Sequence, residues 1–179
     1  VIVGTRNMMK RNNVILNTTN LEKVIAFEEQ GKTAMLVVIN GMFAGIVAVA
    51  DTIKEHSKEA IQRLQNLNIE VWMITGDNER TAKAIAEEVG ISHYIAEVLP
   101  EQKAEEIKKL QEQGKYVAMV GDGINDAPAL AIADIGMAIG TGTDVAMEAA
   151  DITLIRGDLH SIADAIYMSK ETVRNIKQN

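Results

Sequence analysis

Apolar and polar residues follow two different patterns along this chain of 179 residues, and the change falls near residue 50. In the first part, the apolar runs Ala34–Ile39 and Met42–Ala50 are separated only by Asn40-Gly41. Asn-Gly between two such runs is the strongest short signal for a β-hairpin. A small α+β unit is therefore predicted over residues 1–48. Its other predicted elements are a strand over Val1–Val3, a short helix over Asn7–Arg11 and a helix over Leu21–Gln30.

From residue 49 onward, helical patterns alternate with short apolar runs, which is typical of parallel strands joined by crossover helices. The predicted helices cover Ser57–Asn68, Glu79–Val89, Pro100–Gln113, Ala127–Ala133, Val145–Ala149 and the stretch from Leu159 onward. The predicted strands cover Val71–Thr75, Tyr94–Ala96, Tyr116–Val120, Ile135–Ile139 and Ile152–Ile155. Residues 49–179 are therefore expected to form an α/β domain with a Rossmann-like parallel sheet.

The bulk composition narrows the class of protein. Hydrophobic residues make up 47% and charged residues 24%, as in a globular domain. The net charge of -7 argues against a surface for nucleic acid. The chain has no cysteine, which excludes disulfides and thiolate metal ligands. No apolar run approaches the roughly 20 residues that a membrane-spanning helix needs. Both ends interrupt a predicted element, so we expect the chain to come from a longer protein.

The most distinctive stretch follows the predicted strand Tyr116–Val120 and contains Asp122, Asn125 and Asp126. Glycines on both sides of Asp122 allow a tight turn and the close approach of a ligand. Open α/β sheets bind ligands at the carboxyl edge, where the strands end. Carboxylate oxygens there suit Mg²⁺, which takes one or two protein carboxylates together with water and phosphate oxygens. Taken alone, the stretch could also be an ordinary Gly/Asn/Asp turn.

A second predicted strand ends in Thr75-Gly76-Asp77, directly before a helix that begins after Asn78. A hydroxyl group, a glycine and free backbone N–H groups at a helix N-terminus can bind phosphate. A carboxylate would repel that phosphate, so we expect Asp77 to cap the helix or to hydrogen-bond within the loop. Lys103 follows a short strand and is predicted to lie at the same sheet edge, where its ammonium group would neutralise phosphoryl charge. Considered alone, Lys103 would be a surface lysine.

The segments Thr75-Gly76-Asp77, Lys103 and Gly121–Asp126 resemble motifs two, three and four of the haloacid-dehalogenase-like superfamily. Within it, the string Met119–Leu130 looks like the P-type ATPases. The tail Leu154–Asn179 resembles their heavy-metal-transporting branch, and its part Asp158–Asn179 is most similar to the bacterial copper exporters. The resemblance covers nearly the whole chain. It implies the C-terminal part of a nucleotide-binding domain over residues 1–48 and a haloacid-dehalogenase-like phosphorylation domain over residues 49–179.

The resemblance also implies roles for the charged candidates. Asp122 and Asp126 would be Mg²⁺ ligands, and Asn125 would help to organise the Mg²⁺ and phosphate loop. Lys103 would neutralise the transferred phosphoryl group, as expected where positioning and electrostatics carry the chemistry. The implied cofactors are Mg²⁺ and ATP.

The remaining candidates follow from the same resemblance. Thr75 and Gly76 would hold the phosphoryl group, with Asp77 in the same motif. Gly4 resembles a glycine of the adenine pocket in the nucleotide-binding domain. The family more often has Gly-Asn where this chain has Gly4-Thr5, which makes Thr5 a departure from the family pattern.

The family's nucleophile, an Asp within Asp-Lys-Thr-Gly-Thr, does not occur in this sequence. Thr141–Thr143 contains Thr-Gly-Thr but lacks the preceding Asp-Lys, and it is interpreted as a loop. In the family, the missing Asp ends the central strand, so the remaining strands would flank a gap with unpaired edges. We therefore expect the chain alone to be inactive, and to be marginally stable, oligomeric or completed by a separate segment.

The resemblance implies a multi-pass membrane parent that carries this chain on its cytoplasmic face. That parent would couple ATP hydrolysis, through an aspartyl-phosphate, to movement of a soft cation such as Cu⁺ bound elsewhere in the protein. Its implied partners are ATP and the missing N-terminal half of the headpiece. Two alternatives remain open. One is a soluble phosphatase of the same superfamily, which needs an Asp-x-Asp near the N-terminus, and the other is a non-catalytic nucleotide-binding module.

Two further sets of residues are interpreted as structural. His56, His93 and His160 are far apart in the sequence and show no metal-ligand spacing, so we expect surface histidines or histidines with satisfied hydrogen bonds. Asp51 falls at the junction between the two predicted parts and is interpreted as a hinge or cap residue.

Overall fold

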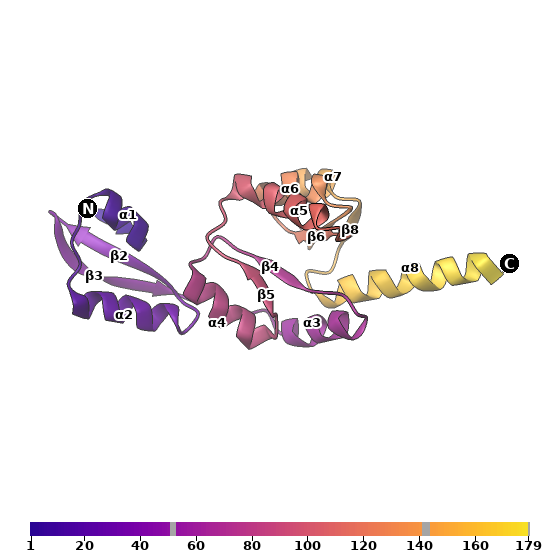
Figure 1. Ribbon diagram of the computed structural model, residues 1–179, viewed down its shortest axis with the longest axis horizontal. Coiled ribbons are helices and arrows are strands. Elements are labelled where there is room, and N and C mark those ends of the chain that lie inside the picture. Colours follow the sequence, from indigo (N-terminus) through magenta and orange to yellow (C-terminus); the bar gives the residue numbers. More distant parts are fainter. Residues whose placement is uncertain (51–52, 141–143, 179) are drawn as a thin grey trace.

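The structure is a computed structural model that describes residues 1–50, 53–140 and 144–178. The molecule is elongated (Figure 1). An antiparallel unit lies at one end, parallel strands and their helices form the middle, and helix α8 (His160–Gln178) projects from the other end. Within the described residues, no helix combines the length and the apolar character needed to cross a membrane.

The first unit is a three-stranded antiparallel sheet in the order β1–β2–β3, with helices α1 and α2. Its elements are β1 (Ile2–Gly4), α1 (Arg6–Arg11), α2 (Thr18–Glu28), β2 (Thr33–Ile39) and β3 (Met42–Val49). The predicted hairpin is confirmed, because β2 and β3 pair around Asn40 and Gly41. Both turn residues have positive φ angles, 50° and 78°, which Asn and Gly adopt most readily. The core of this unit contains Met9, Val24, Ala34, Leu36 and Val38.

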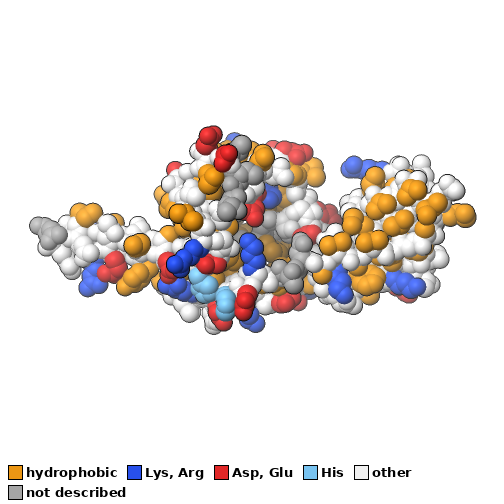
Figure 2. Space-filling model, turned by 180° about the vertical axis from the view of Figure 1, so that it is seen from behind, with side chains coloured by type: hydrophobic (Ala, Val, Ile, Leu, Met, Phe, Trp, Pro, Cys, Tyr) orange, Lys and Arg blue, Asp and Glu red, His pale blue; other side chains and the backbone are white. Residues whose placement is uncertain are grey.

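The opposite face of this sheet is apolar and exposed to solvent (Figure 2). Side chains alternate between the two faces of a strand, so the residues that do not face α2 form a second apolar surface. The exposed members of this surface are Val3, Ile39, Met42, Val47 and Val49. Strands that are apolar on both faces are typical of sheets that are covered on both sides.

The parallel strands of the described residues fall into two sheets. In one sheet, β4 (Trp72–Ile74) pairs with β5 (His93–Ile95). In the other, β7 (Ile135–Ile139) lies between β6 (Ala118–Gly121) and β8 (Ile152–Leu154). The predicted parallel α/β class is confirmed, but the single continuous sheet is not formed, since no ladder joins β4 to β6 in the described chain. The family resemblance leads us to expect such a division where the central strand is absent. The boundary between the two domains remains a prediction.

Helices connect these strands close to the predicted positions. They are α3 (Ser57–Asn66), α4 (Glu79–Val89), α5 (Lys103–Glu112), α6 (Ala127–Ile132) and α7 (Asp144–Ala149), with the single turns η1 (Pro100–Gln102) and η2 (Ile124–Asp126). The start and end of α4 agree with the prediction, because both are set by local residues. The Asn78 side chain accepts hydrogen bonds from the N–H groups of Arg80 and Thr81. Gly90, with a φ of 81°, ends the helix.

Two hydrophobic cores hold the parallel part together. One core joins α3, β7, β8 and the start of α8, and it contains Leu64, Met137, Ile139, Leu154, Ile162 and Ala163. The other joins α5, β6 and α6, and it contains Ile107, Met119, Ala129 and Leu130. The first core holds the start of α8 against α3, and the second holds α5 against β6, whose carboxyl end carries candidate residues.

Glu28 connects the antiparallel unit to α4. Its side chain is only 4% exposed and accepts hydrogen bonds from Arg6 at 2.8 Å and from Arg80 at 3.4 Å. The Thr81 hydroxyl adds a second link by donating to the Lys32 carbonyl oxygen at 3.0 Å. Polar groups from both sides therefore position the first unit on α4.

We expect Glu28→Ala to lower the free energy of unfolding by about 1–3 kcal/mol, because it removes two charge-assisted hydrogen bonds from a buried carboxylate. Both arginines can still reach solvent, which keeps the cost below that of an uncompensated buried charge. Glu29→Ala removes the exposed neighbouring carboxylate and is the matched control. Urea unfolding of both variants measures the difference. Equal midpoints would show that Glu28 does not hold the two parts together.

Candidate functional site

Asp122 and Asp126 lie in the short segment that connects β6 to α6. Strand β6 ends at Gly121, and η2 forms one turn before α6 begins. The Asp126 side chain packs against Gly121, where a Cβ atom would lie 2.6 Å from the Cβ of Asp126. Only glycine allows this approach, since real Cβ atoms do not come that close. Asp122 and Asn125 are exposed, whereas Asp126 is buried.

Asp126 is paired with the predicted lysine. The Lys103 ammonium group donates to Asp126 Oδ1 at 2.7 Å, and the two side chains are only 21% and 11% exposed. Lys103 begins α5 directly after η1, a turn in which the Leu99 N–H donates to Gln102 Oε1 at 3.1 Å. The structure therefore brings together Lys103 and Asp126 from two of the three candidate segments. Such a pair is held by partial exclusion of water and by good geometry.

Thr75, Gly76 and Asp77 follow β4. The Thr75 hydroxyl donates to Asp77 Oδ2 at 2.8 Å and accepts from the Asp77 N–H at 3.1 Å. Asp77 Oδ1 accepts from the Thr33 hydroxyl at 3.0 Å, which ties the loop to β2. Of the two predicted roles for Asp77, hydrogen bonding within the loop is the one observed, and Asn78 is the cap of α4. The sequence contained no signal that singled out Thr33 as a partner.

The segment between β5 and η1 connects these two groups of candidates. The Thr75 N–H donates to the Ile95 carbonyl oxygen, and the Val98 N–H donates to the Thr75 carbonyl oxygen at 3.0 Å. The Glu97 N–H donates to the Asp77 carbonyl oxygen at 2.8 Å. Lys103 follows only one short turn later. The segment after β5 is therefore hydrogen-bonded to Thr75 and Asp77 and continues into Lys103, which is paired with Asp126.

Asp134 fixes α5 relative to β6 on the side away from the ion pair. Its Oδ2 atom accepts from the Val117 N–H at 2.8 Å and from the Gln111 amide at 3.1 Å. These two hydrogen bonds favour the charged form and hold the pKa of Asp134 below its usual value. Gln111 also donates to the Ile132 carbonyl oxygen at 3.1 Å, so its one amide group connects α5 to the end of α6.

The arrangement offers the chemistry that a Mg²⁺–phosphate group requires. Asp122 provides an exposed carboxylate four residues before the buried carboxylate of Asp126 in the same loop, and two such oxygens fit Mg²⁺ only when water and phosphate oxygens complete its shell. Lys103 supplies a fixed positive charge next to the same carboxylate. The donor set therefore fits a magnesium ion that is bound together with a phosphorylated ligand.

The predicted nucleotide-binding residue Gly4 does not lie near the Lys103–Asp126 pair. Gly4 lies in β1 of the antiparallel unit, where a Cβ atom would meet the Met8 sulfur at 2.3 Å. That unit lies to one side of the parallel strands (Figure 1). Asp51 and Thr141–Thr143, for which the sequence predicts a hinge or cap residue and a loop, lie outside the described residues.

Comparison with known families decides the class of this fold. Residues 1–134 match the model of the haloacid dehalogenase-like hydrolases, a span that includes all of the candidate residues above. The chain belongs to this family. In this haloacid dehalogenase-like chain, Thr75–Asp77 directly follows β4 and Gly121–Asp126 begins at the end of β6, whereas Lys103 begins α5 after the turn η1.

This haloacid dehalogenase-like chain is similar to several P-type ATPases. It is 64% identical over all 179 residues to a copper-exporting P-type ATPase of Bacillus subtilis (strain 168), and 58% identical to one of Staphylococcus aureus (strain JH9). The chain spans 22% of the length of each. A solved zinc-transporting PIB-type ATPase superposes with a TM-score of 0.74 and 42% identity, over 90% of this chain and 27% of that one. The catalytic domain of the CPx-ATPase CopB-B gives a TM-score of 0.59 and 32% identity, over 74% of this chain and 56% of that one.

Proposed function

We propose that this chain forms part of the ATP-hydrolysing portion of a heavy-metal P-type ATPase, located on the cytoplasmic face of the membrane that its parent spans. The observation that carries the proposal is the 2.7 Å pair of Lys103 and Asp126, in the same loop as the exposed Asp122 at the carboxyl end of β6. The 64% identity to a copper-exporting ATPase supports Cu⁺ as the transported ion, which the parent would bind elsewhere. ATP and Mg²⁺ are the proposed cofactors.

Each candidate has a proposed role at this site. Asp122 and Asp126 hold Mg²⁺, and Asn125 keeps the loop between them in place. Bound Mg²⁺ supplies positive charge to the transferring phosphoryl group. Lys103 orients Asp126 and adds its own positive charge near the phosphate oxygens.

The residues after β4 are proposed to bind the phosphoryl group itself. Thr75 and Gly76 hold the phosphoryl oxygens. The Thr75 O–H, which donates to Asp77 Oδ2 in this structure, would turn to a phosphoryl oxygen, while the Asp77 N–H continues to donate to the Thr75 oxygen and keeps it in place. Asp77 is thus a positioning residue. Gly4 contributes to the adenine pocket of the nucleotide-binding domain, a role that rests on the family resemblance alone.

The carboxylate that receives the phosphoryl group is proposed to come from a segment outside this chain, since Asp-Lys-Thr-Gly-Thr does not occur in its sequence. The separation of β4 from β6 supports this proposal, because the edges of both strands are available for a strand that would carry the nucleophile. Phosphorylation would then drive the domain rearrangement that moves the ion.

We expect Mg²⁺-dependent ATP hydrolysis only when the chain is mixed with a separately produced segment that carries Asp-Lys-Thr-Gly-Thr. In that mixture, Asp122→Ala should lower the rate at least about 100-fold, because a preorganised charge for the transition state is lost. Glu112→Ala removes an exposed carboxylate at the end of α5 and should leave the rate unchanged. Phosphate release is measured for each mixture, and mass spectrometry detects the aspartyl-phosphate.

Two outcomes would contradict this proposal, and each would favour another function. Hydrolysis by the chain alone would mean that it contains its own nucleophile, which favours a soluble phosphatase of the same family. Nucleotide binding without turnover in any mixture would instead favour a non-catalytic nucleotide-binding module.

A further inference from the structure

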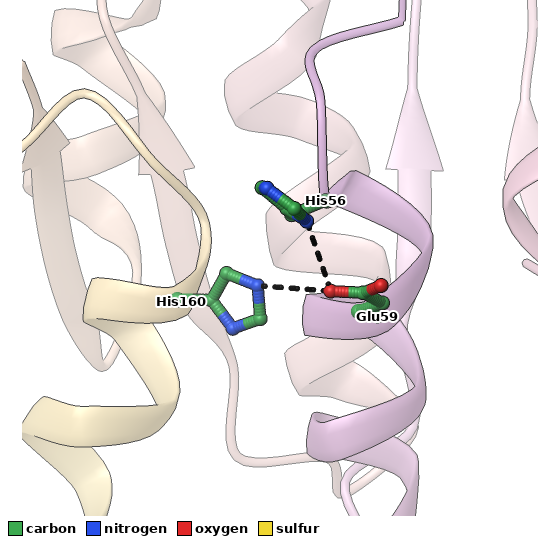
Figure 3. A group of neighbouring side chains, drawn as sticks. All are labelled: His56, Glu59 and His160. Atoms are coloured by element: carbon green, nitrogen blue, oxygen red, sulfur yellow. Dashed lines mark hydrogen bonds and ion pairs between the residues drawn. The ribbon is translucent and has the colours of Figure 1, made fainter.

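Two histidines and a glutamate meet where the start of α8 lies beside the start of α3 (Figure 3). His56 immediately precedes α3, Glu59 is in its first turn, and His160 is the first residue of α8. Glu59 Oε2 lies 3.0 Å from His56 Nδ1 and 3.9 Å from His160 Nε2. Histidine side chains are visible at the surface near the base of α8, beside acidic and basic groups (Figure 2).

The packing of α3 against α8 fixes this arrangement. One helical turn beyond Glu59 and His160, Arg63 and Asp164 form an ion pair of 2.7 Å between the same two helices. The buried side chains of Leu64, Ile162 and Ala163 belong to the core that these helices share. The three polar side chains are therefore held near one another by the fold and do not depend on their own contacts.

We propose that His56, Glu59 and His160 form a binding site for a divalent transition-metal ion such as Zn²⁺, which would clamp the start of α8 to α3. The three ligand atoms lie within 4.8 Å of one another. In a tetrahedral zinc site with Zn–N bonds of about 2.0–2.1 Å, ligand atoms are about 3.3 Å apart. The two measured separations, 3.0 Å and 3.9 Å, lie on either side of this value, so small side-chain rotations complete the geometry.

The types of ligand favour zinc and its neighbours in the first transition row. Imidazole nitrogen suits Zn²⁺, Cu²⁺ and Ni²⁺, whereas Mg²⁺ and Ca²⁺ require oxygen ligands. Two histidines and one carboxylate leave a fourth position, and it faces solvent because His56 and Glu59 are exposed. Water would complete the coordination. The site is separate from the Lys103–Asp126 pair and does not depend on the proposed ATPase function.

A second carboxylate supports His56 as a ligand. Glu55 Oε1 lies 3.7 Å from His56 Nε2, the ring nitrogen that does not face Glu59. Histidines that bind metals commonly donate their other N–H group to a carboxylate, which fixes the tautomer and strengthens the ligand. His56 thus has a metal-facing nitrogen and a carboxylate near the opposite nitrogen.

The interpretation of the three histidines as surface residues or residues with satisfied hydrogen bonds is compatible with this structure, in which His56 and His93 are exposed, but it did not anticipate that His56 and His160 lie close together. His56 and His160 are far apart in the chain, and only the contact between α3 and α8 places them together. His93 lies elsewhere, stacked on Trp72 at 4.8 Å and 3.2 Å from Glu70. It is therefore a matched control, since it is also a surface histidine beside one glutamate.

The test is a Zn²⁺ titration of the 179-residue chain without an affinity tag, with Co²⁺ absorption as a report of the coordination geometry. We expect one metal ion per chain, and binding at least about tenfold weaker in His56→Asn and in His160→Asn. His93→Asn should bind as the unchanged chain does. Asparagine tolerates the left-handed backbone at position 56, where φ is 66°, so this variant is expected to fold normally.

A second measurement separates a defined site from loose association with surface histidines. Zn²⁺ should raise the thermal unfolding temperature of the unchanged chain and of His93→Asn, because a ligand that binds only the folded state stabilises it. It should not do so in His160→Asn. Equal affinity in His160→Asn and the unchanged chain, or an equal loss in His93→Asn, would overturn the proposal.

Discussion

Leu130→Ala is expected to lower the free energy of unfolding by about 2–5 kcal/mol. Leu130 is 1% exposed in α6 and shares a core with Ile107, Met119 and Ala129. Truncation of a buried leucine costs the lost transfer free energy and leaves a cavity that the surroundings fill only partly. The total stability of a domain is about 5–15 kcal/mol, so this loss is a large fraction of it.

The expected effect extends to the candidate site. The core around Leu130 joins α5, which starts at Lys103, to β6, which leads into the Asp122 turn. Loosening this core should therefore weaken the Lys103–Asp126 pair as well as the fold. Ile155→Ala truncates an isoleucine that is 87% exposed and serves as the control. Urea unfolding followed by circular dichroism compares the two variants, and a midpoint no lower in Leu130→Ala than in Ile155→Ala would contradict the expectation.

Gly121→Ala is expected to separate Lys103 from Asp126 and to lower the free energy of unfolding by about 1–3 kcal/mol. The added Cβ atom would lie 2.6 Å from the Cβ and 2.9 Å from the Cγ of Asp126. Because Cβ is the first atom of the side chain, a rotation about χ1 cannot move it away, and the turn after β6 must shift. In the mixture that hydrolyses ATP, we expect a rate at least about 100-fold lower, as for the loss of Asp122.

Gly45→Ala is the matched control for this substitution. Gly45 lies in β3, its φ is outside the left-handed region, and no atom lies within 4 Å of an added Cβ. Alanine at such a position restricts the unfolded chain and should leave stability unchanged or slightly higher. Unfolding midpoints and the ATPase rate of the two variants are compared. If Gly121→Ala retained the stability and rate of Gly45→Ala, the close approach of Asp126 would not be required.

Local patterns were sufficient to predict the elements of this fold. Asn40-Gly41 between two apolar runs predicted the hairpin, and the structure confirms it through two positive φ angles. Asn78 and Gly90 predicted both ends of α4, because a cap and a left-handed glycine act on the adjacent turn. Each end of β4 and β5 differs from the prediction by one residue, since both strands are short and, within the described residues, pair with each other alone.

The candidate site was predictable in its chemistry and only partly in its contacts. The motifs singled out Lys103 and Asp126, and the structure places them 2.7 Å apart. The motifs did not indicate that Asp77 would bond to Thr33, because that contact depends on how the antiparallel unit lies on α4. The catalytic roles of these residues stay proposals.

The sequence by itself determined which residues carry charge, which segments become strands or helices, and which strand ends hold the acidic and basic groups. These properties depend on neighbours within one or two turns of the chain. Only the tertiary structure decided that Glu28 joins two arginines, that β4 and β6 lie in separate sheets, and that His56 meets His160. Such contacts join residues that are distant in the chain, and they follow from the packing of whole helices and sheets, which no local pattern records.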